Sequence, residues 1–390
     1  MRRHIGFGTK AVHVGSEPDH TGAVTPPIYL SSTFKQPDAT MSGKYIYSRG
    51  ANPTRERLEK SIASLEEAKY ALAFSSGMAA IDAVLRMLKP GDHIIALDNL
   101  YGGTLRLLKD LNNRYNIKVT FTDLTNLENL EKAITPETKM VFLETPSNPL
   151  LKIVDIKEVS RRAHEKGLIV VVDNTFATPY NQRPLTLGAD IVIHSLTKYL
   201  SGHSDIIGGA VALNNDEYYE KIYFNRISTG GILSPFDSWL TLRGIRTLHL
   251  RVERHNYNAM KIAEYLANHE KIEKVYYPGL KEHPGHEVAK RQMITPKGEP
   301  GYGGMVSFKL KADLKNTIKF LNSLRIITLA VSLGGVESLI HAPITGIYRH
   351  MSKEEVGKMG ITENFIRFSV GVEDVEDLIG DLEQALRKID

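Results

Sequence analysis

Short apolar runs alternate with amphipathic stretches between about residues 56 and 235. The runs are rich in Val, Ile, Leu and Phe, which is typical of buried strands, and the stretches between them repeat their apolar residues at helical spacing. This alternation predicts an α/β fold, with a mostly parallel sheet covered by helices on both faces. The predicted strands are 71–74, 92–97, 118–121, 140–143, 168–172 and 190–193, and the clearest helices are 103–113, 126–134 and 155–166.

The limits of this alternation predict three segments. Residues 1–55 hold Pro and Gly among polar residues without periodicity, which predicts an N-terminal arm. Residues 56–250 form the α/β domain, and residues 251–390 form a smaller α+β domain. A long helical stretch from 234 to 266 is expected to bridge the two domains. The smaller domain is predicted to contain strands at 305–310, 326–331 and 366–370 and helices at 313–323 and 374–388.

Composition narrows the class of protein. The 390 residues are 42% hydrophobic and 24% charged, as in ordinary soluble proteins, and the net charge of +4 is spread out, which does not favour a nucleic-acid partner. The absence of cysteine excludes disulfides and thiolate metal sites. The chain begins without an apolar signal region and has no run long enough to span a membrane, so we expect a cytoplasmic protein that does not bind membranes. His283 and His286 flank Pro-Gly, which favours a turn over a metal site.

The stretch around Lys198 is the strongest candidate for chemistry. The run 191–193 reads as a buried strand, and Ser195, Thr197 and Lys198 follow at its carboxyl end, where open α/β sheets bind ligands. An amine can form a Schiff base with an aldehyde, and neighbouring hydroxyls can donate to a phosphate, so the group fits pyridoxal phosphate. The alternative is a surface lysine after a strand.

Other polar residues also stand just past predicted strands. Gly77 lies between a strand and a helix, where backbone amides can approach a phosphate; the alternative is a tight turn. Asp173 ends an aliphatic run, and a buried carboxylate there needs a cation such as a protonated pyridine nitrogen; the alternative is a helix cap. Tyr101, beside two glycines, could stack on a planar ring and act as an acid or base; the alternative is packing.

Two further candidates would bind anions. Tyr47 and Arg49 lie two residues apart in the arm, and their phenol and guanidinium groups are suited to binding an anion. The alternative is that both are loop residues facing solvent. Arg367 stands inside a predicted strand, where a carboxylate partner would suit it; the alternative is an ordinary edge-strand arginine.

The order of these motifs along the chain is more specific than any one of them. The sequence resembles the pyridoxal-phosphate enzymes of cysteine and methionine metabolism, the family of cystathionine γ-lyase, cystathionine γ-synthase and methionine γ-lyase, from about Thr9 to the end. A dinucleotide-binding enzyme is disfavoured because no Gly-x-Gly-x-x-Gly follows the first strand, and the diffuse charge disfavours a basic binding protein. The matching segments are 27–34, 47–49 with 52–54, 75–78, 101–104, 144–149, 173–176, 194–198 and 367–371.

The resemblance assigns a role to each candidate and implies the fold of the type I pyridoxal-phosphate enzymes. Lys198 is expected to hold the aldehyde of the cofactor, Asp173 to face its pyridine nitrogen, and Tyr101 to stack on its ring and act as an acid at the departing sulfur. The phosphate is expected to bind Gly77, Met78, Ser195 and Thr197, joined by Tyr47 and Arg49 of a neighbouring subunit. Asn148 is placed near the ring hydroxyl and the substrate, and Ser332 and Arg367 hold the substrate carboxylate.

The resemblance also implies a homo-oligomer, at least a dimer and in the family usually a tetramer, and a small amino-acid substrate. We expect γ-elimination from a sulfur amino acid, releasing a thiol, 2-oxobutanoate and ammonia. The alternatives are a γ-replacing synthase or sulfhydrylase, which uses an acylated homoserine and a thiol, and a methionine γ-lyase.

Several positions depart from the family pattern and bear on the substrate. Relatives that act on cystathionine often carry acidic residues where this chain has Ile46 and Val331, and methionine γ-lyases usually carry cysteine in place of Gly103. The family motif Pro-x-x-Met-Thr-His is replaced by the segment 343–348, so the role of that histidine is either absent or supplied by Tyr348 or His350. The loop 295–300 is also expected to be longer than in relatives.

Overall fold

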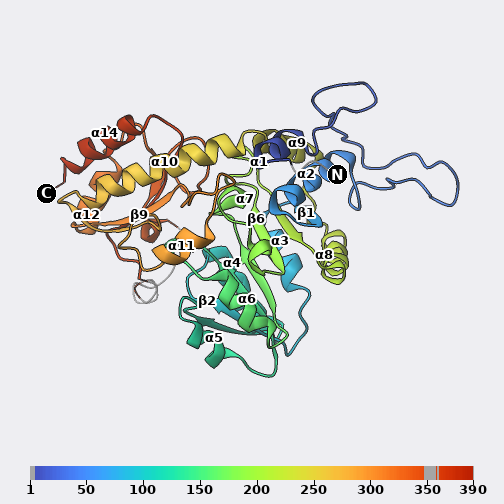
Figure 1. The fold of residues 1–390 in the computed structure, drawn as a ribbon, viewed down its shortest axis with the longest axis horizontal. Helices are drawn as coiled ribbons and strands as arrows, with labels where there is room; N and C mark the ends of the chain where they lie inside the picture. The colour runs from blue at the N-terminus through green and yellow to red at the C-terminus, as the bar shows by residue number, and fades with distance from the viewer. Residues whose placement is uncertain (1–4, 347–356, 358–359, 390) are drawn as a thin grey trace.

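A seven-stranded sheet forms the centre of the larger domain (Figure 1). The computed structural model describes residues 5–346, 357 and 360–389. The strand order is β1-β7-β6-β5-β4-β2-β3, and every neighbouring pair is parallel except those made by β7. The strands are β1 (Tyr70–Phe74), β2 (His93–Leu97), β3 (Lys118–Thr122), β4 (Thr138–Glu144), β5 (Ile169–Asp173), β6 (Ile191–Ser195) and β7 (Gly209–Leu213).

Helices cover both faces of this sheet, which explains why its central strands are apolar throughout. One face packs against α3 (Gly77–Leu85), α4 (Gly102–Arg114), α6 (Ile156–His164) and α8 (Asp216–Thr229). The other packs against α2 (Pro53–Glu66) and α9 (Pro235–Ile245). Shorter elements complete the layers: α5 (Leu127–Ala133), α7 (Thr178–Asn181) and the 3₁₀ turn η1 (Pro184–Leu187).

The helix α10 (Leu248–Ala267) joins the two domains. Leu248 and Val252 belong to the core of the larger domain, whereas Ile262 and Leu266, near the other end, belong to the core of the smaller one. A single rigid element therefore shares its apolar stripe between both cores. The predicted stretch 234–266 is two helices rather than one, because the chain leaves helical geometry at Thr247, between α9 and α10.

The smaller domain is built on a five-stranded sheet in the order β10-β11-β12-β9-β8. Its strands are β8 (Ile272–Tyr276), β9 (Met305–Leu310), β10 (Thr328–Leu329), β11 (Leu339–His341) and β12 (Phe365–Ser369). Within the part of this domain that the structure describes, these strands are accompanied by α11 (His286–Gln292), α12 (Leu314–Leu321), α14 (Val375–Leu386) and the 3₁₀ turn η2 (Pro343–Thr345). The predicted strand 326–331 is shortened to two residues, Thr328–Leu329, because only these pair with β11.

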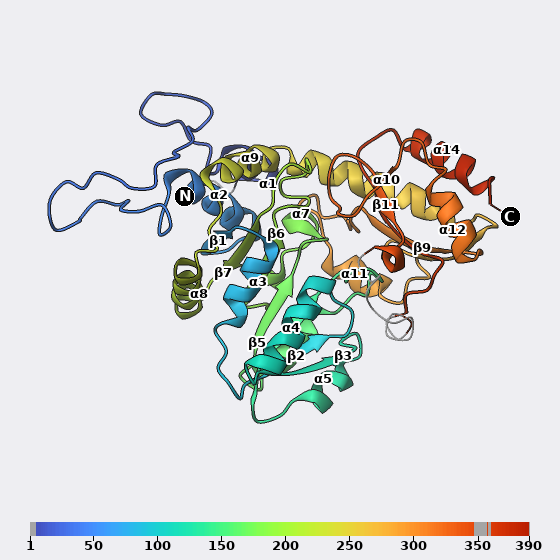
Figure 2. The same ribbon diagram turned by 180° about the vertical axis from the view of Figure 1, so that it is seen from behind.

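The N-terminal arm leaves the body of the molecule as open loops (Figures 1 and 2). Antiparallel contacts join the outgoing and returning chain, with a bridge between Thr33 and Tyr47. The sequence did not predict α1 (Phe7–His13), whose Phe7 packs edge-on against Tyr180 with ring centroids 5.3 Å apart. The proposed boundaries of 1–55, 56–250 and 251–390 remain predictions; α2 begins at Pro53, just before the first of them.

All six strands predicted for the larger domain are present, within one or two residues at each end. The antiparallel strand β7 and the helix α8 were not predicted. The turn at 283–286 is confirmed, since the Gly285 amide donates to His283 Nδ1 at 3.0 Å. Among the residues described, no helix has both the length and the apolar character needed to cross a membrane.

Candidate active site

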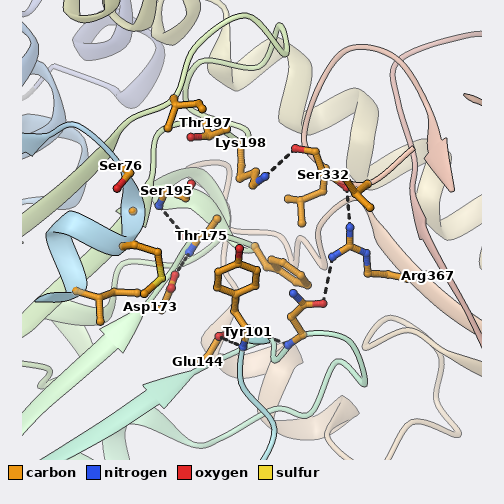
Figure 3. Close-up of a pocket in the computed structure, with 18 residues that line it drawn as sticks. Ser76, Tyr101, Glu144, Asp173, Thr175, Ser195, Thr197, Lys198, Ser332 and Arg367 are labelled. Carbon is orange, nitrogen blue, oxygen red and sulfur yellow. Dashed lines mark hydrogen bonds between the residues drawn. The ribbon is translucent and has the colours of Figure 1, made fainter. Parts of the chain in front are cut away.

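A cavity of about 350 Å³ lies at the carboxyl edge of the large sheet, on the side facing the smaller domain (Figure 3). Side chains that follow β1, β2, β4, β5 and β6 line it, and the smaller domain closes it with residues after β10 and from β12. The strands that supply the lining are parallel, so their carboxyl ends meet at one edge. The lining residues used below are Gly77, Met78, Tyr101, Glu144, Asn148, Asp173, Thr175, Phe176, Ser195, Thr197, Lys198, Ile207, Val331, Ser332 and Arg367.

Lys198 points its amine across this cavity (Figure 3). Its Nζ donates to Ser332 Oγ at 2.7 Å. Burial, with a smaller contribution from the positive charge of Arg367, lowers the pKa of the amine to about 8. Since the unprotonated amine is the nucleophile and the base, this environment prepares Lys198 to react with an aldehyde.

One end of the cavity presents donors suited to a phosphate. The helix α3 begins there at Gly77, and the first amides of a helix have no intrahelical acceptor. A Cβ at Gly77 would lie 3.1 Å from Ser195 Cβ, so glycine permits the close approach of these two segments. Thr197 Oγ1 accepts from the Gly208 amide at 3.0 Å, which fixes this hydroxyl beside the cavity.

Two carboxylates lie side by side at the floor of the cavity. Glu144 and Asp173 end β4 and β5 as Cα register partners. Burial raises the pKa of Asp173. Hydrogen bonds from Thr175 act in the opposite direction and lower this pKa by a smaller amount; the Thr175 amide donates to Asp173 Oδ1 at 3.0 Å. Burial and the neighbouring charge of Asp173 raise the pKa of Glu144 well above its usual range. For both groups to be ionised together, a cation must lie beside them, and a protonated ring nitrogen would provide one.

Tyr101 stands at the mouth of the cavity, with 41% of its surface exposed. It is the residue before α4, and its amide donates to Glu144 Oε2 at 2.9 Å. Gly103 lies beneath its ring, since a Cβ at that position would be 2.5 Å from Tyr101 Cε1 and 2.9 Å from Met78 Sδ. The glycine thus determines where the aromatic ring can lie.

The smaller domain contributes an anion-binding group. Arg367 lies in the interior strand β12 and not at a sheet edge, which excludes the edge-strand alternative. Its guanidinium donates to the Ser332 carbonyl at 2.7 Å and to Asn148 Oδ1 at 3.2 Å, and the three residues line the cavity together (Figure 3). A buried guanidinium beside an open cavity suits a ligand carboxylate.

The structure thus brings together all the predicted site residues except two. Tyr47 and Arg49 lie on the exposed arm, with the Arg49 guanidinium 5.5 Å from the centroid of the Tyr47 ring, and they do not line the cavity. The sequence did not single out Glu144, Thr175 or Phe176. The sequence signal for them was their position within the segments 144–149 and 173–176, which follow predicted strands and match the family pattern.

The residues present fit pyridoxal phosphate. A reactive amine, a buried carboxylate, an aromatic face and a helix N-terminus with hydroxyls surround one cavity, and each matches one part of that cofactor. The cavity size also suits a cofactor with a small amino acid.

The described residues of the two segments that depart from the family pattern do not line this cavity. No residue of 295–300 lines the cavity, and Lys297 instead bridges to Glu253 of α10 at 2.9 Å. Pro343–Thr345 form η2. Tyr348 and His350, the predicted substitutes for the family histidine, lie outside the described residues.

Comparison with known proteins agrees with this fit. Residues 8–387 match the sequence profile of the family described as Cys/Met metabolism PLP-dependent enzyme. A solved structure of cystathionine gamma-lyase from Lactobacillus plantarum, complexed with L-serine, superposes with a TM-score of 0.94 at 43% identity and covers 99% of each chain.

Curated relatives carry three different names. The chain is 48% identical to cystathionine gamma-lyase of Dictyostelium discoideum, over 98% of both chains. It is 50% identical to cystathionine beta-lyase of Lactococcus lactis subsp. cremoris (strain MG1363), over 97% of this chain and 98% of the other. It is 46% identical to cystathionine gamma-synthase of Mycobacterium tuberculosis (strain CDC 1551 / Oshkosh), over 98% of this chain and 97% of the other.

Proposed function

The chain belongs to the Cys/Met metabolism PLP-dependent enzymes, and from this membership we propose that it is a carbon–sulfur lyase acting at the γ-carbon of a sulfur amino acid. The products are a thiol, 2-oxobutanoate and ammonia. The observation that carries this proposal is the cavity in which Lys198, Asp173 and Arg367 converge, because these groups serve the cofactor aldehyde, the ring nitrogen and the substrate carboxylate.

Holding the cofactor is assigned to residues of the larger domain. The N-terminus of α3 and the hydroxyls of Ser195 and Thr197 would bind the phosphate, Asp173 would pair with the ring nitrogen, and Tyr101 would cover the ring. Bound pyridoxal phosphate supplies an electron-withdrawing ring that acidifies the protons on the substrate carbons. All other steps use side chains of this protein.

Lys198 is the base of the reaction. With a pKa of about 8, roughly a tenth of its amine is unprotonated at pH 7, far more than for an ordinary lysine. Arg367 fixes the substrate carboxylate, so the proton on the α-carbon is presented to the lysine side of the cavity. Tyr101, at the mouth, is the acid that protonates the departing sulfur.

Tyr47 and Arg49 are assigned to the phosphate site of a second copy of the chain. The arm that carries them exposes apolar side chains, with Val24 and Leu30 each 73% exposed, which favours packing against another subunit. The working unit is then at least a dimer, with a tetramer as the assembly expected from the family.

A γ-replacing synthase is the second candidate. Cystathionine carries a distal ammonium, and the cavity wall at Val331 is apolar, as is Ile46 on the arm, so neither provides the carboxylate that would pair with that group. Each missing charge-assisted contact costs roughly 1.5–3 kcal/mol of binding. Acylated homoserines lack a distal ammonium and do not need this contact.

Steady-state kinetics distinguish these functions. The kcat/KM values are measured for cystathionine, methionine and homocysteine, and for O-acetyl- or O-succinylhomoserine with cysteine or sulfide. A lyase releases 2-oxobutanoate from the thioethers, and pyruvate in its place would identify β-elimination. The lyase proposal is wrong if the ester with the thiol is preferred about a hundredfold and elimination is negligible.

A Val331→Glu variant tests the apolar wall, since it should raise kcat/KM for cystathionine relative to methionine.

A further inference from the structure

We propose that Glu144 is a positioning residue that links the carboxylate-binding Arg367 to the ring-covering Tyr101. The inference rests on the proposed function, since it assigns those two roles to Arg367 and Tyr101. Glu144 itself is not expected to touch the reacting atoms. Its role is to hold two neighbouring loops, which follow β2 and β4 and carry Tyr101 and Asn148, in a fixed relation.

The evidence begins with the two hydrogen bonds of its carboxylate. Oε2 accepts the amide of Tyr101 at 2.9 Å, and Oε1 accepts the amide of Asn148 at 2.8 Å. The side chain is buried, with only 4% of the residue exposed. Neither amide belongs to a strand or to the hydrogen-bonded interior of a helix, so one carboxylate replaces the backbone partners that both loops lack.

The chain of contacts continues into the smaller domain. Asn148 Oδ1 accepts from Arg367 at 3.2 Å, so Tyr101, Glu144, Asn148 and Arg367 form one connected series (Figure 3). The series crosses from the end of β4 to β12. A shift of Arg367 when it binds a substrate carboxylate is thereby transmitted to the loop that carries the aromatic ring.

Other contacts hold the bases of the same loops without reaching the reacting groups. Ser147 Oγ donates to Asn99 Oδ1 at 2.6 Å, and Lys152 Nζ bridges Asp98 and Asp123 at 2.9 and 3.0 Å. These bonds can keep the loops folded when Glu144 is changed. The carboxylate therefore has a separable role, which is to place the tips of the loops that carry Tyr101 and Asn148.

A carboxylate is required because both of its oxygens accept. The glutamine side chain has the same shape but only one oxygen, and its NH₂ group would face one of the two amides. Glu144→Gln can therefore hold one loop but not both. Leaving one buried amide without an acceptor releases either Tyr101 or Asn148 from its position.

The test compares Glu144→Gln with Asp123→Asn as holoenzymes. Asp123 is a matched control because its carboxylate holds the same region through Lys152 and contacts neither Tyr101 nor Asn148. Three properties are measured: kcat and KM for the preferred substrate, the visible circular dichroism of the bound cofactor, and the dissociation constants of L-alanine and L-alaninamide. The last pair isolates recognition of the carboxylate.

We expect Glu144→Gln to change the circular dichroism, to lower kcat about 10- to 100-fold, and to weaken L-alanine about tenfold while leaving L-alaninamide within about twofold. Asp123→Asn should stay near wild type in its kinetic constants, its circular dichroism and its affinity for the two ligands. Wild-type dichroism with unchanged discrimination between the two ligands would overturn the inference, and so would equal deficits in both variants.

Asn148→Ala keeps the test decisive if Glu144→Gln is poorly stable, and a double-mutant cycle adds a second check where both variants fold. Asn148→Ala keeps its own amide on Glu144 but breaks the contact with Arg367, so it should weaken L-alanine more than L-alaninamide. In the Asn148→Ala background, Glu144→Gln should no longer affect L-alanine, whereas additive losses would contradict the linkage. If the wild-type enzyme proves to be a synthase, the ligand and dichroism measurements still apply, so the two proposals fail independently.

Discussion

Lys198 Nζ and Ser332 Oγ are 2.7 Å apart although they belong to different domains. Ser332 has a φ of +89°, a left-handed conformation that costs energy for a residue with a side chain. The hydroxyl is thus held in place by the smaller domain, directly beside the reactive amine of the larger one. Correct placement of that amine therefore depends on the packing of the two domains.

Replacing Ser332 by alanine removes this hydroxyl and leaves the backbone strain unchanged. We expect kcat to fall about tenfold with little change in the free energy of unfolding, because one hydrogen bond to the amine is lost. Steady-state kinetics and urea denaturation measure the two effects. A Ser332→Gly variant relieves the strain and serves as the comparison, since it should be equally slow but more stable.

Lys198→Ala should lose turnover by several orders of magnitude, because the attachment point of the cofactor and the base disappear together. Borohydride reduction of the wild-type holoenzyme followed by peptide mapping should place the cofactor on Lys198. The Lys152→Ala variant lacks another lysine at the same sheet edge, and in it the reduced cofactor should still be found on Lys198. Trapped cofactor on any other lysine would refute the assignment.

The lowered pKa of Lys198 predicts a pH effect on the cofactor-free protein. Burial, aided by the charge of Arg367, lowers this pKa from an ordinary 10.5 to about 8. Acylation of Lys198 should therefore be half-maximal near pH 8, well below the pH needed for exposed lysines. Competitive labelling with acetic anhydride and mass spectrometry measures this, and half-maximal labelling near 10.5 would contradict the burial argument.

The same shift has a consequence for stability. Between about pH 8 and 10.5 the unfolded chain holds a proton on Lys198 that the folded protein has already released, so stability rises with pH across this window. Urea denaturation of the wild type should show this rise relative to Lys198→Met, which has no group to titrate.

Mixed oligomers test whether Tyr47 and Arg49 serve a second subunit. Arg49→Ala and Lys198→Ala should each be nearly inactive alone. When the two chains are co-expressed, a site that combines Lys198 of one chain with Arg49 of the other is intact, so about a quarter of the wild-type activity should return on random pairing. No recovery would show that Arg49 acts within its own chain, and an active Arg49→Ala variant would show that Arg49 does not serve the site.

Gly103→Ala should displace the ring of Tyr101. The added Cβ would lie 2.5 Å from Tyr101 Cε1, closer than atoms can approach without movement. We expect a changed visible spectrum of the bound cofactor and a kcat lowered about 10-fold or more. Gly380→Ala is the control, since a Cβ in that helix would meet no atom within 4 Å and should leave the spectrum unchanged.

Much of the site could be predicted because it lies at strand ends. Apolar runs located the ends of β2, β4, β5 and β6, and parallel pairing places those ends at one edge, so the neighbourhood of Tyr101, Asp173 and Lys198 followed from local pattern. The strand β7 was missed because its run, Gly209–Leu213, directly continues the glycine-rich loop. The break between α9 and α10 was missed because the apolar spacing continues through it.

The sequence by itself determined the strand-and-helix alternation and the family, and it singled out Lys198 as a candidate for chemistry, since hydrophobic period and motif order are local properties of the chain. The tertiary structure decided what depends on distant contacts. It brought Ser332 and Arg367 over the lysine, and burial among them lowered the lysine pKa. It also turned Glu144, which resembles any strand-end carboxylate in the sequence, into the acceptor for the amides of Tyr101 and Asn148. Burial and distance are set only when the strand ends and the two domains pack together, which explains why no local pattern could predict these relationships.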